Sequence, residues 1–192
     1  MKKPSILILG TGAIGGLYGA MLARSGAADV TFVARSDYAH LQQQGLRINS
    51  VWGHFHIRFP QDAHLIQASE TLAQKPDYIL VALKVLPSVN LQTLLTPYLG
   101  PHTVIVLEQN GVAIEAPVAA AFPHHQLISC LAFVCSVRSA PGVIDHTAHG
   151  FLHMGTYPQG VSEQAAALAQ LFKQAGVKTD ALPNIQAEKK KK

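Results

Sequence analysis

Short apolar runs alternate along the chain with segments in which apolar residues recur at helical spacing. Ser5–Leu9 is a continuous apolar run that stops at Gly10, a pattern typical of a strand buried on both faces. Ala13–Ser25 has apolar residues three and four positions apart and is followed by Gly26, which predicts a helix that ends at a glycine. Because strands that alternate with helices usually pair in parallel, the pattern predicts an α/β fold class with a doubly wound, mostly parallel sheet.

Further segments continue this alternation. Five more strands are expected in short apolar runs: Asp29–Ala34, 46–49, 54–59, 77–83 and 103–107. The runs 46–49 and 54–59 would pair with each other as a hairpin. Two more helices are expected, one at 85–98 and one at 111–121 with an interruption at Pro117. These elements complete a repeating strand–helix unit.

After residue 126 the pattern changes to two long β-type runs. The runs, 127–137 and 142–154, are joined around Pro141-Gly142 and predict an antiparallel ribbon appended to the parallel sheet. Cys130 and Cys135 lie in the first run, five positions apart, so a strand would point them to opposite faces. A mutual disulfide is therefore not expected, and both are interpreted as buried free thiols in a reducing compartment.

Three elements are expected beyond the ribbon. Ser162 is placed to cap a helix over 162–174, and an edge strand is expected at 177–181. Asn184 is placed to cap one more helix, from Ile185 onward.

The turn between the first strand and the first helix fits the pattern G-x-G-x-x-G: Gly10-Thr11-Gly12-Ala13-Ile14-Gly15. A buried strand before this pattern and a helix after it are the context that dinucleotide binding requires. Gly10 would permit the tight turn, Gly12 would leave room for a pyrophosphate, and Gly15 would let the helix approach the strand. The helix N–H groups and dipole would attract the phosphates. The alternative is an ordinary tight strand–helix turn.

Arg35, at the end of the second strand, indicates which dinucleotide is bound. Sites for NAD usually carry Asp or Glu at this position, about 20 residues beyond the glycines, to hold the ribose hydroxyls. A cation there would instead pair with a 2′-phosphate, so the sequence favours NADP (NADPH). The alternative is a solvated arginine at a strand end.

Composition excludes several classes of protein. The chain has 192 residues with a formal net charge of +4, and without the four lysines 189–192 it carries 11 basic and 11 acidic residues. Because nucleic-acid binding depends on phosphate neutralisation, such a balance argues against a nucleic-acid partner. No apolar run approaches the roughly 18 residues of a membrane span, and the N-terminal apolar stretch is too short for a secretory signal. We expect a soluble, cytoplasmic protein without a membrane partner.

Three polar residues follow later strands, where ligands of such folds bind. Lys84 follows the run 77–83, and Glu108 and Asn110 follow 103–107. Lys84 and Asn110 are candidate cofactor-binding residues, although a solvated lysine and an ordinary Asn-Gly turn are the plainer interpretations.

The chain also has ten histidines, but none shows the spacing of a zinc site, and no metal site is predicted. Seven of them are considered as metal ligands and are interpreted instead as surface or strand-facing residues: His54, His56, His124, His125, His146, His149 and His153.

In its motifs the sequence resembles the ketopantoate reductases (2-dehydropantoate 2-reductases), members of the 6-phosphogluconate-dehydrogenase-like group. The resemblance runs in order through nearly the whole chain: ILGTGAIGGLYGAMLARSG, VAR, DYILVALK, LEQNGV, SVRSAPGVIDHTAHGFLHMG and LPNIQAEKKKK. It implies a Rossmann-type fold and hydride transfer from NADPH to the 2-keto group of ketopantoate, which gives pantoate for pantothenate and coenzyme A synthesis.

The resemblance also assigns residues. Arg35 would take the 2′-phosphate, Lys84 would lie by the cofactor, and Asn110 would lie between the nicotinamide and the small 2-keto acid substrate. The family's general-acid lysine follows an Ala-Glu pair by four residues, a register that Lys192 matches. If the four terminal lysines are an altered end, that match is accidental.

Family members continue into an all-helical domain that supplies the rest of the substrate site. We therefore expect a dinucleotide-binding domain over 1–183 and the start of a truncated helical domain over 184–192. The chain would bind cofactor, turn over weakly or not at all, and expose apolar surface that favours a homodimer. The alternatives are a non-catalytic NADP(H)-binding module and a reductase of another branched 2-keto acid.

Overall fold

The computed structural model describes residues 3–84, 89–109, 111 and 113–190. The strands of the described residues have the following bounds: β1 (Ser5–Leu9), β2 (Asp29–Ala34), β3 (Leu46–Ser50), β4 (Phe55–Ile57), β5 (His64–Gln67), β6 (Tyr78–Val81), β7 (Val104–Leu107), β8 (Leu127–Ala140), β9 (Val143–Thr156) and β10 (Thr179–Ala181). The helices are α1 (Ala13–Ser25), α2 (Tyr38–Gln44), α3 (Leu91–Leu95), which continues into a 3-10 turn (Thr96–Tyr98), α4 (Glu115–Ala121), α5 (Glu163–Gln174) and α6 (Ile185–Lys189).

One sheet runs through the molecule, with the strand order β4-β3-β9-β8-β7-β6-β1-β2-β5 and with β10 beside β9. The strands from β8 through β5 pair in parallel, whereas β8 and β9 form a long antiparallel ribbon and β3 and β4 a hairpin. The predicted fold class, a mostly parallel Rossmann-type sheet with an antiparallel ribbon, is confirmed. The strand order reverses at β1, because β2 is added on one side of it and β6 on the other, and this places the β1–α1 turn where such sheets bind ligands.

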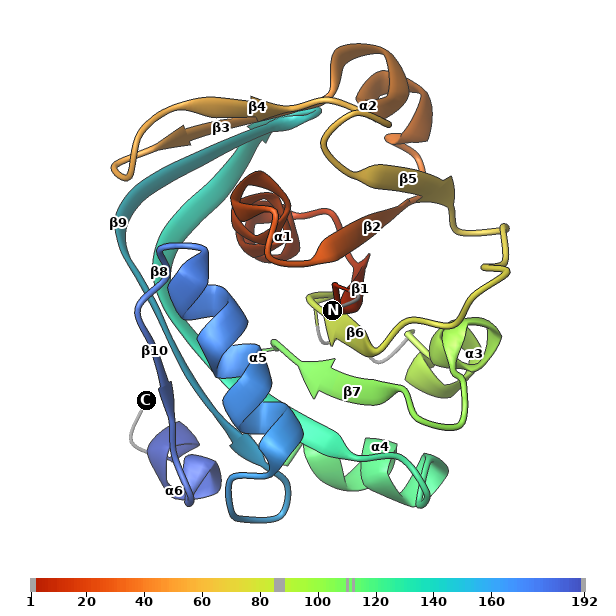
Figure 1. The fold of residues 1–192 in the computed structure, drawn as a ribbon, viewed down its shortest axis with the longest axis vertical. Coiled ribbons are helices and arrows are strands. Elements are labelled where there is room, and N and C mark those ends of the chain that lie inside the picture. The colour runs from red at the N-terminus through yellow and green to blue at the C-terminus, as the bar shows by residue number, and fades with distance from the viewer. Residues whose placement is uncertain (1–2, 85–88, 110, 112, 191–192) are drawn as a thin grey trace.

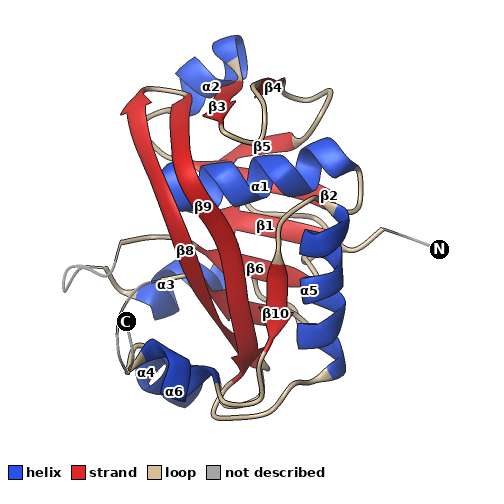
Figure 2. Ribbon diagram, turned by 90° about the vertical axis from the view of Figure 1, so that its left-hand side faces the viewer, coloured by secondary structure: helices blue, strands red, loops and turns tan. Residues whose placement is uncertain are grey.

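Helices cover the two faces of the sheet. Figure 1 shows that the ribbon of β8 and β9 curves around α1 and α5, which lie on one face, while α3 and α4 lie on the other. Figure 2 shows α1 crossing behind the ribbon and α6 lying near the lower end of β8 and β9. Buried apolar side chains form one core with α1 and α5 and a second with α3 and α4.

Both predicted caps are confirmed. The side chain of Ser162 accepts a hydrogen bond from the N–H of Ala165 at the start of α5 (3.1 Å), and Asn184 caps α6 through the N–H of Ala187 (3.1 Å). Each cap satisfies an N–H group that has no partner inside its helix.

The structure corrects several sequence expectations. It adds α2 and β5, which the hydrophobic pattern did not reveal because α2 is short and buries only Leu41. Within the described part of 85–98, helix begins only at Leu91, where Asn90 caps it. Pro117 does not interrupt α4 but lies in its first turn, where its missing N–H costs nothing. Cys130 is buried, as expected, but Cys135 is exposed.

Among the described residues, no helix combines the length and the apolar character needed to cross a membrane.

Candidate functional site: a groove at the glycine-rich turn

A cavity of about 460 Å³ opens at the carboxyl ends of β1, β2 and β6. The turn Gly10-Thr11-Gly12 forms its floor, and Arg35 and Asp37 line it from the segment after β2. Lys84 contributes from the segment after β6, and Arg138 reaches it from the ribbon. Residues from four separate parts of the chain therefore meet at the position where the fold binds ligands.

The three glycines of the turn have different surroundings. Gly10 has φ +111°, which favours glycine, and a Cβ there would lie 3.0 Å from the backbone of Ala82. A Cβ on Gly15 would lie 2.2 Å from the Gly10 carbonyl oxygen, because α1 packs directly onto the turn. A Cβ on Gly12 would meet nothing within 4 Å. Gly10 and Gly15 thus shape the turn, while Gly12 leaves open space at the groove.

The start of α1 presents unpaired N–H groups to this groove. The N–H of Gly16 donates to the Gly12 carbonyl (2.8 Å), the first bond of the helix, so earlier N–H groups have no intrahelical partner. No side chain caps α1, and its first turn has no acidic residue. This arrangement suits an anion, which would take the place of a cap.

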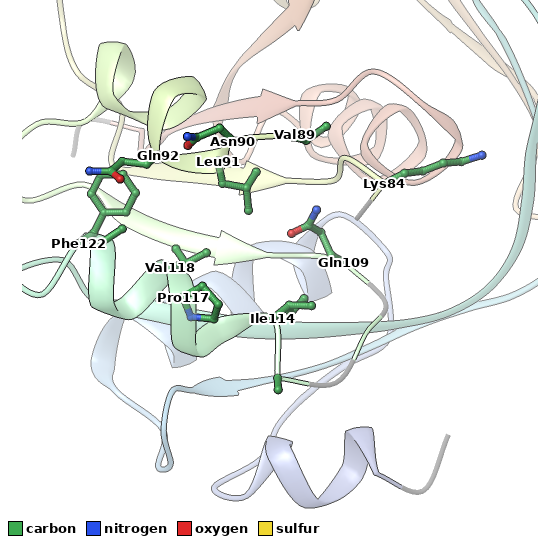
Figure 3. Close-up of a pocket in the computed structure, with 12 residues that line it drawn as sticks. Lys84, Val89, Asn90, Leu91, Gln92, Gln109, Ile114, Pro117, Val118 and Phe122 are labelled. Carbon is green, nitrogen blue, oxygen red and sulfur yellow. The ribbon is translucent and has the colours of Figure 1, made fainter. Parts of the chain in front are cut away.

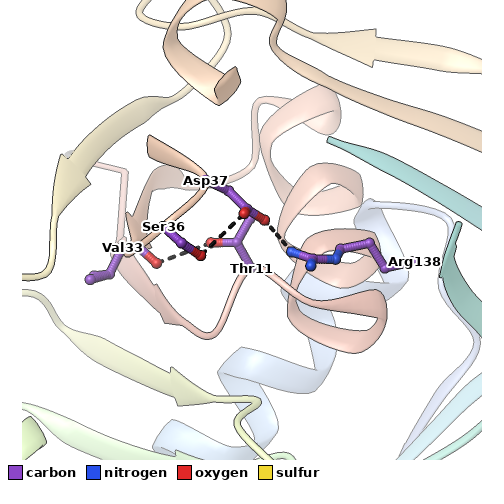
Figure 4. A network of polar contacts seen from close by, with 5 residues as sticks. All are labelled: Thr11, Val33, Ser36, Asp37 and Arg138. Carbon is purple, nitrogen blue, oxygen red and sulfur yellow. Dashed lines mark hydrogen bonds and ion pairs between the residues drawn. The ribbon is translucent and has the colours of Figure 1, made fainter. Parts of the chain in front are cut away.

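Polar contacts connect the groove's walls (Figure 4). The hydroxyl of Thr11 donates to the Val33 carbonyl oxygen (3.0 Å) and ties the glycine turn to β2. Asp37 forms an ion pair with Arg138 and accepts a 3.3 Å hydrogen bond from the hydroxyl of Ser36. Arg35 is exposed and forms no ion pair with any other described residue, so its guanidinium is available to a ligand.

A second cavity of about 480 Å³ lies between α3 and α4 and shares Lys84 with the first (Figure 3). Its walls are largely apolar and include Leu91, Val118 and Phe122. Gln109 is the buried polar group at its inner end: its Nε2 donates to the Leu83 carbonyl (2.6 Å), and its Oε1 has no partner among the described residues. Gln109 could have been identified from the sequence, because it lies in the motif LEQNG after the strand, but only its neighbours Glu108 and Asn110 were singled out.

Not all predicted site residues come together in the described structure. The cavity gathers Gly10, Thr11, Gly12, Arg35 and Lys84, and Ala13 to Gly15 form the first turn of α1. Asn110 and Lys192 lie outside the described residues.

Glu108 follows β7, as the sequence indicated, but it lines neither of these two cavities. Its side chain is buried on the opposite face of the sheet from Gln109, and both carboxyl oxygens lack a partner among the described residues. Burial raises the pKa of Glu108 to about 8. Its charge in turn contributes to raising the pKa of Tyr18 and Cys130, after desolvation, the larger cause. Glu108 is therefore a core residue of the α1 face.

Glu115 at the start of α4 is buried with a partner. It receives hydrogen bonds from the Lys189 ammonium and from the Ser129 hydroxyl (2.6 Å). Burial alone would raise the pKa of Glu115, but these hydrogen bonds and the lysine charge hold it below its ordinary value. No sequence pattern pointed to this contact, because the two partners of Glu115 come from the distant elements α6 and β8.

Among the described residues, no three histidine, cysteine, aspartate or glutamate side chains gather in a way that could hold a metal ion. His146 is buried against Trp52, with ring centroids 4.3 Å apart. Its Nδ1 lies 2.8 Å from the Ser50 hydroxyl, and its Nε2 lies 3.1 Å from the carbonyls of Ala148 and His149.

Comparison with known proteins places the chain in a family. The family model described as ketopantoate reductase PanE/ApbA matches residues 6–159. A 2-dehydropantoate 2-reductase of Nostoc sp. is 32% identical over 192 residues, which cover 96% of this chain and 58% of the relative. The crystal structure of a 2-dehydropantoate 2-reductase from Methylococcus capsulatus superposes with a TM-score of 0.88 at 44% identity, covering 96% of this chain and 59% of that one. A second, from Geobacter metallireducens, superposes with a TM-score of 0.84 at 30% identity, covering 96% and 60%.

The chain thus spans somewhat less than three-fifths of the length of the Nostoc relative. The match nevertheless includes the glycine turn, the strands that form the groove and the ribbon that borders it. On this evidence the chain belongs to the ketopantoate reductase family.

Proposed function

We propose that the chain is the NADPH-binding part of a 2-dehydropantoate 2-reductase, which reduces ketopantoate to pantoate. The observation that carries the proposal is the groove formed by the glycine turn and Arg35, which has no ion pair with another described residue, in a chain that belongs to this family. The relatives named 2-dehydropantoate 2-reductase supply the activity and the substrate.

The described residues fit a phosphorylated dinucleotide. The open space at Gly12 and the unpaired N–H groups of α1 suit a pyrophosphate. Arg35, at the end of β2, would bind the 2′-phosphate through a charge-assisted hydrogen bond. Lys84, at the border of the two cavities, would lie by the cofactor as a further cation.

When bound, NADPH would supply a hydride for the 2-keto carbon of the substrate. The protein must then stabilise the negative charge that develops on the keto oxygen and deliver a proton to it. An ammonium does both, and Lys192 is the candidate by its register after Ala187-Glu188. Asn110, which follows Gln109, is the candidate for the position between the nicotinamide and the substrate.

Cofactor titration of the chain tests this proposal. We expect NADPH to bind more tightly than NADH, and Arg35→Ala to weaken NADPH by about tenfold or more, since it removes a charge-assisted contact. NADH, which lacks the 2′-phosphate, should be affected little. Equal weakening of both cofactors by Arg35→Ala, or no binding of either, would show the proposal to be wrong.

Two alternatives are separated by activity measurements. A non-catalytic NADP(H)-binding module would bind NADPH without oxidising it, whereas any ketopantoate-dependent oxidation of NADPH excludes that alternative. Because the chain spans 58% of the Nostoc relative, we expect that turnover to be slow or absent. A reductase of another branched 2-keto acid would oxidise NADPH faster with that acid than with ketopantoate.

Self-association into a homodimer is a further part of the proposal. The exposed large apolar residues of the described chain are Val51, Val137 and Val161, and the α3–α4 cavity adds apolar surface. Sedimentation velocity at several concentrations tests it, and a monomer throughout would contradict it.

A further inference from the structure

One ion pair crosses the groove, between Arg138 of the ribbon and Asp37, which lies two residues beyond Arg35. We propose that Arg138 is a specificity-determining residue for the dinucleotide, because it neutralises Asp37 and thereby lets the groove accept a phosphorylated ribose. This inference rests on the function proposed above, and it adds a residue from a different part of the chain to the choice between NADPH and NADH.

The charges that line the groove support this role. The described lining residues include three cations, Arg35, Lys84 and Arg138, and a single carboxylate, that of Asp37. The side chain of Asp37 is 21% exposed and that of Arg138 is 44% exposed, so solvent and ligands reach both. Three cations against one carboxylate give the lining a net positive charge, and loss of Arg138 would lower that charge and leave the one carboxylate without its partner.

An uncompensated Asp37 would favour the other cofactor. In NAD sites a carboxylate just beyond the second strand accepts hydrogen bonds from the ribose hydroxyls. The same carboxylate would repel a 2′-phosphate, which carries up to two negative charges. Asp37 lies in this segment, and its two oxygens are engaged by Arg138 and by the hydroxyl of Ser36. Arg138 thus occupies the carboxylate that ribose hydroxyls would otherwise use.

The ribbon holds Arg138 in place for this contact. The hydroxyl of Ser136, two residues earlier, donates to the Ala13 carbonyl at the start of α1 (3.2 Å). Arg138 pairs with Ile144 beside a register shift in the ribbon, and such irregularities redirect side chains. Figure 4 shows the Arg138 side chain extending from the ribbon toward Asp37, next to Thr11 of the glycine turn. The guanidinium keeps further N–H donors for a phosphate.

Calorimetric titration with NADPH and with NADH, at one fixed ionic strength, tests the inference on four proteins. These are the unsubstituted chain, Arg138→Gln, Asp37→Asn and the double variant. Arg47→Gln is the matched control, since Arg47 is an exposed arginine on the adjoining β3 and does not line the groove. Circular dichroism of each variant verifies that the chain remains folded.

We expect Arg138→Gln to weaken NADPH binding by about tenfold and to leave NADH unchanged or tighter, because Asp37 is then uncompensated. Asp37→Asn should leave NADPH binding unchanged or tighter, and the double variant should recover most of the loss. Equal weakening of both cofactors by Arg138→Gln, or a double variant as weak as Arg138→Gln, would overturn the inference while the proposed function stands. A chain that binds neither cofactor would overturn both.

Discussion

The ammonium of Lys189 on α6 and the carboxylate of Glu115 on α4 form an ion pair that is almost completely buried, with side-chain exposures of 2% and 0%. The two residues are 74 positions apart, and the Ser129 hydroxyl of β8 donates a second hydrogen bond to the same carboxylate oxygen, Oε1. The contact fastens α6 to the sheet and to α4. It therefore fixes the position of α6 relative to α4 and β8.

Breaking this pair should destabilise the protein strongly. Glu115→Gln leaves a buried ammonium without its counter-charge, which costs about 3–5 kcal/mol of the free energy of unfolding. The double variant Glu115→Gln/Lys189→Met removes both charges and should recover most of that loss. Urea denaturation of Glu115→Gln, Lys189→Met and the double variant measures the coupling free energy between the two charges. Additive losses of stability would show that the charges do not interact.

The same pair predicts acid sensitivity. The pKa of Glu115 is lowered in the folded state. The contribution of its charge to the free energy of unfolding is therefore fully present above the ordinary glutamate pKa, near 4.5. It is lost as the pH falls from there through the lowered value. Between pH 5 and pH 3 the unsubstituted chain should therefore lose more stability than the double variant does. A parallel loss in both would contradict the prediction.

Glu108 should have the opposite pH dependence. Its folded-state pKa of about 8 lies above the ordinary value of 4.5, so the folded protein binds more protons between these limits. Stability should fall as the pH rises from about 5 to 8, by up to about 1.4 kcal/mol per pH unit. Glu108→Gln should abolish this slope and be the more stable protein at pH 9. Glu163→Gln, an exposed site on α5, is the control, and an unchanged slope in Glu108→Gln would refute the assignment.

Two glycines of the turn provide a matched pair of substitutions. Gly15→Ala places a methyl group 2.2 Å from the Gly10 carbonyl oxygen, and backbone cannot easily yield, so a loss of about 1–3 kcal/mol or more is expected. Gly12→Ala meets no protein atom within 4 Å and should change stability by less than about 1 kcal/mol. It should nevertheless weaken NADPH binding, because the methyl group occupies the open space of the groove. Thermal unfolding and NADPH titration separate the two effects.

His146 should stabilise β9, where it lies beside a register shift of the ribbon, through its hydrogen bonds. Two carbonyls lie near its Nε2 and a hydroxyl near its Nδ1, so we expect Nε2 to donate to a carbonyl and Nδ1 to accept from Ser50. His146→Phe keeps the aromatic contact with Trp52 but leaves buried polar groups unpaired, at a cost of about 1–3 kcal/mol. His64→Phe, at an exposed position of β5, should cost much less, and NMR of the ring nitrogens checks the tautomer.

Local features of this fold could be predicted because each is written in a few neighbouring residues. The uninterrupted apolar run predicts β1 without knowledge of the rest of the fold. The glycines at 10, 12 and 15 likewise predict the tight turn, because glycine permits backbone conformations that other residues rarely adopt. The caps at Ser162 and Asn184 likewise depend on residues three positions away. Short elements such as α2 escaped, since seven residues with one buried side chain carry too little periodic signal.

The sequence by itself determined the class of the fold, the glycine turn and the arginine beyond β2, because periodicity and backbone conformation are local properties. Only the tertiary structure brought Arg138 to Asp37 across 101 positions, and Lys189 to Glu115 across 74. These meetings depend on the strand order and on the curvature of the ribbon, which no short stretch of sequence specifies. The same long-range packing buried Glu108, directly after β7, in the core on the α1 side, whereas its neighbour Gln109 lines the cavity between α3 and α4.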